Sequence, residues 1–138
     1  MATRSFTTDL TLSEVEQFLS DLQDAREIYD KYEEQSASAS IIFGMLGLAG
    51  APAVIVTVAG IATGFLGYYY DTIENTITKA IEKLNHYRDF LDEHSDYDQV
   101  RMQLTVNVVN LEGKEYWIPQ DFKDIAIHST SRGWIPIS

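Results

Sequence analysis

A chain of 138 residues suits one compact domain, and its formal net charge of −11 makes it too acidic to attract a nucleic-acid backbone. The sequence contains no cysteine, which excludes a disulfide framework, thiolate metal sites and a cysteine nucleophile. Its apolar content of 45% and aromatic content of 12% exclude global disorder.

The first twelve residues, 1–12, are expected to form an N-terminal arm that leads into an amphipathic helix. No apolar run follows the first arginine, so this start does not have the pattern of a secretory signal peptide. Ser13 and Glu16 have the spacing of a capping box, and apolar residues then recur every three or four positions. The pattern predicts a helix over about 13–35, whose buried face is formed by Val15, Phe18, Leu22, Ala25, Tyr29 and Tyr32.

An uncharged segment, residues 41–70, lies between two acidic segments. Gly50 and Pro52 stand in the order that ends one helix and begins the next, so a hairpin of helices is expected, over about 38–49 and 52–70. A helix from Ala53 to Tyr70 would be about 27 Å long, close to the ~30 Å hydrocarbon thickness of a bilayer. The segment therefore predicts a helical hairpin that enters a lipid membrane.

Small and aromatic residues in this segment indicate how inserted hairpins would associate. In lipid, glycines let helices approach closely, and Gly60 and Gly64 form a GxxxG pair. Aromatic residues at the boundary between apolar and charged sequence are typical of a membrane interface. The expected membrane and oligomer interface comprises Gly44, Gly47, Gly50, Gly60, Gly64, Gly67, Phe65, Tyr68, Tyr69 and Tyr70, and Thr57 and Thr63 could face a water-filled lumen.

The rest of the chain predicts one more helix and a few strands. A three–four spacing of apolar residues continues the helix from Tyr70 to about Glu93, where an acidic run ends it. The spaced residues are Tyr70, Ile73, Ile77, Ala80, Leu84, Tyr87 and Leu91. Alternation around Leu104 predicts a strand, a glycine turn follows it, and later short runs predict returning strands. The expected fold class is therefore mainly α, with a helical region over 13–98 and a small C-terminal antiparallel β element over 99–138.

No enzymatic or metal site is expected. His86 and His94 lie near an acidic run, but the run lacks the glycine and ligand spacing of a calcium loop, so a solvated helix end is the simpler interpretation. No motif brings a catalytic triad together, so neither catalysis nor a cofactor is predicted. The aromatic residues Tyr116, Trp117 and Trp134 could form an exposed patch for a partner or pack inside a small sheet.

The layout of residues 13–93 is similar to that of α-helical pore-forming toxins, in which amphipathic helices shield a hydrophobic hairpin. The resemblance implies a soluble form that converts to a membrane-bound homo-oligomer, and it leaves room for a second protein component. Membrane insertion is the leading hypothesis for function. The alternative is a soluble structural or assembly protein whose uncharged hairpin is a buried core or a subunit interface, since the flanking amphipathic helices also need an apolar partner.

Overall fold

The computed structural model describes residues 2–20, 22–23, 40–43, 54–57, 63–111 and 114–137. A helix over residues 12–20 and 22–23, called the N-terminal helix below, follows the first strand. The remaining elements, in chain order, are β1 (Ala2–Thr11), β2 (Ser40–Phe43), β3 (Val54–Thr57), α2 (Thr63–Glu93), β4 (Tyr97–Leu111), β5 (Lys114–Ser129) and β6 (Gly133–Pro136). Four strands form an antiparallel sheet in the order β1-β4-β5-β6, and β2 pairs with β3 in a separate ribbon.

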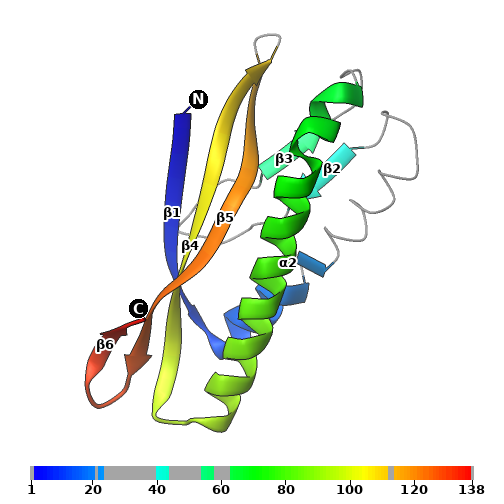
Figure 1. Ribbon diagram of the computed structural model, residues 1–138. Helices are drawn as coiled ribbons and strands as arrows, with labels where there is room; N and C mark the ends of the chain where they lie inside the picture. The colour runs from blue at the N-terminus through cyan, green and yellow to red at the C-terminus, as the bar shows by residue number, and fades with distance from the viewer. Residues whose placement is uncertain are drawn as a thin grey trace.

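Strand β4 determines which side of the sheet becomes the core. Alternate side chains of a strand point to opposite faces. Val100, Met102 and Leu104 are at most 1% exposed, whereas the intervening Arg101 and Gln103 are half-buried on the other face. Figure 1 shows α2 lying along β5, and buried residues of α2 and β4 belong to one hydrophobic cluster, so the helix covers the apolar side. We call the opposite side, which neither helix of the described residues covers, the open face.

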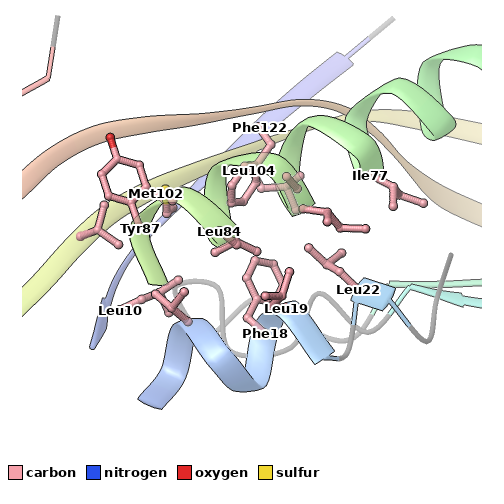
Figure 2. Packing of buried hydrophobic residues seen from close by; sticks show 14 of the residues in the cluster. Leu10, Phe18, Leu19, Leu22, Ile77, Leu84, Tyr87, Met102, Leu104 and Phe122 are labelled. Atoms are coloured by element: carbon pink, nitrogen blue, oxygen red, sulfur yellow. The ribbon is translucent and has the colours of Figure 1, made fainter. Parts of the chain in front are cut away.

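Both helices bury one apolar stripe against the sheet. The ring centroid of Phe18 in the N-terminal helix lies 6.0 Å from that of Phe122 in β5. Figure 2 shows side chains from the N-terminal helix, α2 and the sheet pointing toward one another. The spacing-based core predictions are confirmed for Val15, Phe18, Leu22, Ile77, Ala80, Leu84, Tyr87 and Leu91, while Ala25, Tyr29 and Tyr32 lie outside the described residues.

The N-terminal helix is capped by Thr11 and Glu14, two residues earlier than predicted. The Thr11 N–H and hydroxyl donate to Glu14 Oε1 at 3.1 and 3.0 Å, and the Glu14 N–H donates to Thr11 Oγ1 at 3.4 Å. Thr11 is also the last residue of β1. The strand therefore runs directly into the helix, and the capping box at Ser13 and Glu16 was wrong because an equivalent pair lies nearer the strand end.

The mainly helical fold class was wrong. About half of the described residues are in strands and 42% are in helices. The expected arm is β1, which pairs with β4 over its full length, from Ala2 opposite Val108 to Thr11 opposite Gln99. The C-terminal strands are antiparallel, but they form the main sheet and not a small appendage, because β4 and β5 span 15 and 16 residues.

The helical hairpin expected in residues 41–70 was also wrong. Ile41 lies opposite Val56, and Phe43 lies opposite Val54, in paired antiparallel strands, and α2 begins only at Thr63. The uncharged run had been interpreted as helical, but branched Ile and Val side chains favour strands, which is what residues 40–43 and 54–57 form. The described part of the chain holds no helix with both the length and the apolarity that a bilayer crossing requires. The transmembrane helical-hairpin layout of a pore-forming toxin is therefore not retained.

Replacing Leu84 by alanine should destabilise the fold by about 2–5 kcal/mol, because Leu84 is fully buried between the helices and the sheet and the deletion leaves a cavity. Urea unfolding followed by circular dichroism measures this loss. Glu82→Ala, at an exposed position of the same helix, serves as the control and should change stability by less than about 0.5 kcal/mol. Equal effects of the two substitutions would contradict the core described above.

Candidate functional site

A group of charged and aromatic side chains crosses the open face of the sheet. Residues directly opposite each other in an antiparallel pair share a face. Asp9 in β1 lies opposite Arg101 in β4, and Trp134 in β6 lies opposite His128 in β5. Together with Asp98, which contacts His128, these residues draw on all four strands. We call this group the open-face cluster: Asp9, Asp98, Arg101, His128 and Trp134.

Arg101 is the centre of the open-face cluster. Its Nε and Nη2 donate to the two carboxylate oxygens of Asp9 at 2.7 and 3.2 Å, which is the fork geometry of a strong ion pair. Its Cζ lies 4.1 Å from the ring centroid of Trp134, in cation–π contact. Ala126 on β5 lies opposite Arg101 and is only 5% exposed. Arg101 thus connects β1 to β6 across the sheet.

His128 forms the second half of the open-face cluster. Its Nδ1 lies 2.5 Å from Asp98 Oδ1, and its ring meets the Trp134 ring edge-on at a centroid distance of 5.0 Å. For the other ring nitrogen, Nε2, no hydrogen bond is found within the described residues. No serine or threonine hydroxyl of those residues contacts this ring, so the His–Asp pair lacks the nucleophile of a triad.

The nearby Ser129 stabilises a turn of the backbone. The hydroxyl oxygen of Ser129 accepts the backbone N–H groups of Ser131 and Arg132 at 3.3 and 3.2 Å, and the residue is 1% exposed. It therefore stabilises the turn between β5 and β6.

Across the described ranges, no three His, Asp or Glu side chains gather in a way that could hold a metal ion. His86 and His94 stack around Phe90 on α2, with His94 4.3 Å from the phenyl centroid.

On the helix side of the sheet, Asp124 joins α2 to β5. Asp124 accepts hydrogen bonds from Lys83 Nζ at 2.9 Å and from the hydroxyl of Tyr87. Burial raises the pKa of Asp124, but the hydrogen bonds from Tyr87 and Lys83 outweigh this and leave the pKa below its ordinary value. Burial, followed by the bond to Asp124, raises the pKa of Tyr87, so its hydroxyl stays protonated. The group therefore fixes α2 to β5.

The third feature is β1 itself, which ends the sheet. Its ten residues pair with β4 without any register shift, whereas the β4–β5 ladder has three. On the open face, Ser5 Oγ lies 3.1 Å from Thr105 Oγ1, and Gln103 Nε2 donates to Thr7 Oγ1 at 3.4 Å. Sheet edges are normally protected by charged residues, proline, a bulge or a short length. β1 has no proline and no bulge, and its charged residues are Arg4 and Asp9, while the other edge, β6, has four residues and ends in Pro136.

The predicted interface residues fall partly within the described chain. Gly64 and Gly67 lie in the first turns of α2, which also contain Phe65 and residues 68–70. Thr57 ends β3 and Thr63 begins α2, so the two threonines belong to different elements. The remaining predicted glycines lie outside the described residues: Gly44, Gly47, Gly50 and Gly60.

The predicted aromatic patch is not a single patch. Trp117 of β5 lies opposite Val108 of β4, whereas Trp134 of β6 lies opposite His128 of β5. His128 is eleven residues further along β5 than Trp117. That separation is on the order of 35 Å at ~3.3 Å per strand residue. Tyr116 lies beside Trp117, opposite Val109. Trp134 belongs instead to the open-face cluster.

Sequence reasoning missed the polar members of this cluster. Alternation within β4 could have placed Arg101 on the face opposite the core, because its neighbours Val100 and Met102 are apolar. Nothing local connects Arg101 to Asp9, which lies 92 residues away in the chain. No family model, curated protein or solved structure matches this chain. Its function is therefore argued from the geometry of the described residues.

Replacing Asp124 by asparagine should flatten the loss of stability in acid. A carboxyl whose folded-state pKa is depressed stabilises the fold above its unfolded pKa, about 3.9, and that stability is lost as pH falls through the folded pKa. The wild-type unfolding free energy should therefore fall more steeply below about pH 4 than that of Asp124→Asn. Urea unfolding across this pH range measures both slopes. Asp92→Asn, at an exposed position of α2, should keep the wild-type slope; parallel curves for Asp124→Asn would contradict the role of Asp124.

Replacing Arg101 by alanine should loosen β1 while leaving the helices in place. The substitution removes both the fork to Asp9 and the contact with Trp134. Hydrogen exchange followed by mass spectrometry should show faster exchange in β1, with α2 near the wild-type rate, and the Trp134 emission should shift to longer wavelength. Lys123→Ala, at an exposed position of β5, is the control and should do neither. Unchanged β1 exchange in Arg101→Ala would show that the open-face cluster does not hold this strand.

Proposed function

We propose that this protein is a non-enzymatic assembly protein whose copies associate through the edge of the four-stranded sheet. The observation that carries the proposal is β1, an unbroken ten-residue edge strand without proline, lysine or a bulge. Long edge strands are a common template for the addition of another strand. The open-face cluster supports the same role, because it holds β1 in a fixed position on the sheet.

The formal charge of β1 does not oppose self-association at this edge. Two chains of net charge −11 repel each other over most of their surface. β1 contains one cation, Arg4, and one anion, Asp9, so its formal net charge is zero. Two copies that approach through β1 bring together a part of the surface that adds no local excess of like charge.

The chemistry of the described side chains favours assembly over catalysis. The exposed His128–Asp98 pair has no adjacent nucleophile among these residues, and the buried polar group at Asp124 fixes a helix to the sheet. Binding to lipid stays a prediction from the uncharged central sequence, and the proposal does not depend on it. The function is thus a soluble assembly role, which the sequence offered as its alternative.

Sedimentation velocity of the full chain tests this proposal. The mass should rise from 15.6 kDa toward twice that value as the concentration increases from about 1 to about 200 μM. Raising the salt from about 0.15 to about 0.5 M should strengthen the association, because the remaining charges repel and salt screens them. A mass that stays at 15.6 kDa under all these conditions would refute self-assembly.

A further inference from the structure

We propose that β6 acts as a latch for β1, the strand at the opposite edge of the sheet, with Arg101 connecting the two. In this arrangement Trp134 is a positioning residue, because its contact with Arg101 keeps that side chain on Asp9. β6 and β1 are not neighbours, since the strand order is β1-β4-β5-β6. The inference goes beyond the proposed function: it concerns how firmly β1 is held within one copy and does not depend on self-association.

Arg101 can contact both edge strands at once because the two contacts use different parts of its guanidinium group. Nε and Nη2, at the rim of the planar group, donate to the two carboxylate oxygens of Asp9 at 2.7 and 3.2 Å. Cζ, at the centre of the group, lies 4.1 Å from the ring centroid of Trp134. Arginine donates along its rim and stacks on an aromatic ring through its flat face. The two contacts therefore do not compete.

Each of the two contacts makes the other more favourable. Fixing a long arginine side chain in one conformation costs rotamer entropy. One conformation of Arg101 serves both contacts, so this loss is incurred once for the two of them. The side chains of Arg101 and Asp9 are 33% and 37% exposed, and an ion pair so accessible to water is weak by itself. Losing the Trp134 contact should therefore also weaken the bond to Asp9.

Trp134 is itself fixed by the hairpin of β5 and β6. The His128 ring meets the indole edge-on at 5.0 Å between centroids, and His128 Nδ1 lies 2.5 Å from Asp98 Oδ1. The turn of the hairpin is joined to the turn between α2 and β4, because the Thr130 N–H donates to the Asp96 carbonyl at 2.9 Å. The indole is thus a rigid surface for the guanidinium group, which is the condition for one side chain to position another.

Among the contacts described on the open face, the one through Arg101 carries β1 to a strand beyond β4. Ser5 Oγ, by contrast, lies 3.1 Å from Thr105 Oγ1, and that contact ends on β4. The latch therefore acts on the part of β1 around Asp9, residues 7–11, where the strand runs into the N-terminal helix.

Replacing Trp134 by leucine tests the latch from the far edge of the sheet. Leucine keeps an apolar side chain on β6 but offers no π face to Arg101. Amide exchange of the full chain, followed by NMR, should become at least about threefold faster for residues 7–11, although β4 and β5 lie between the two sites. Trp134→Phe, which restores a π face, should recover part of the protection. Unchanged exchange of residues 7–11 in Trp134→Leu overturns the inference.

Ile77→Val separates the latch from a general loss of stability. Ile77 lies in α2 and is fully buried on the core side, so losing one methylene weakens the fold without touching the open face. Such a loss should speed exchange in β1 and α2 together. In Trp134→Leu the increase for residues 7–11 should exceed that of α2 by about threefold. Equal increases in the two elements would make the effect global and would contradict the latch.

Asp9→Asn tests whether Arg101 transmits the effect. Asparagine removes the charge and one acceptor oxygen of the fork, so β1 no longer depends on the guanidinium group. Adding Trp134→Leu to this variant should therefore speed exchange of residues 7–11 by less than about twofold. If the second substitution has its full effect in the Asp9→Asn background, the two sites act independently and the inference is wrong.

The coupling should also act in the reverse direction, because linkage between two sites is reciprocal. Asp9→Asn should speed exchange of the Ile137 amide, which follows β6 and donates to the Ile125 carbonyl at 2.9 Å. Circular dichroism and thermal melting check that each variant is folded. Should Trp134→Leu not fold, Arg101→Lys decides, since lysine keeps the charge without the fork and the flat face. Faster exchange at both strands supports the latch, and unchanged exchange at either one overturns it.

Discussion

Pairing between β1 and β4 is the constraint on which the other parts of this molecule depend. It joins Ala2 to Val108 and Thr11 to Gln99, segments separated by almost the whole length of the chain. Closing so large a loop costs conformational entropy, which ten consecutive residue pairs and the buried Leu10 help to offset. Because β1 ends in the cap of the N-terminal helix, the same pairing also places that helix against α2, where Phe18 and Leu22 complete the core (Figure 2).

The alternation of β4 divides polar chemistry between two sides of the sheet. On the core side, Asp124 can be partly buried as a carboxylate because Lys83 and Tyr87 supply donors, which is the condition for burying charge at all. On the open face, Arg101 lies between Asp9 and Trp134, and its guanidinium group stays partly exposed to solvent. The first arrangement orients a helix, and the second secures the edge strand, so both serve the geometry of the sheet.

A fixed edge strand is useful only if something pairs with it. The two edges of this sheet differ in length and in proline content, and the proposed assembly uses the longer edge, which contains no proline. The acidic parts of the surface repel one another, so contacts between copies are disfavoured there. In the proposed assembly, backbone pairing would join the copies.

Much of the helical part could be predicted from the sequence, because helix periodicity is a local property. The apolar spacing of α2 and its end at Glu93 were visible, as was the alternation around Leu104 in β4. The capping box was misplaced by two residues, since Thr11 and Ser13 both satisfy the local rule and only the end of β1 decides between them. The spacing of apolar residues identified the buried face of each helix and of β4, but it did not show which other element each face would pack against.

Local patterns in the sequence were enough to assign the apolar faces of both helices, the alternation of β4 and the absence of cysteine chemistry. The folded chain was needed to show that residues 40–43 and 54–57 are strands, that the N-terminal arm is the edge of the sheet, and that Arg101 meets both Asp9 and Trp134. The difference lies in the range of the interactions. A short run of Ile, Val and Gly has no period that separates a helix from a strand, and strand pairing joins residues whose distance along the chain leaves no local trace.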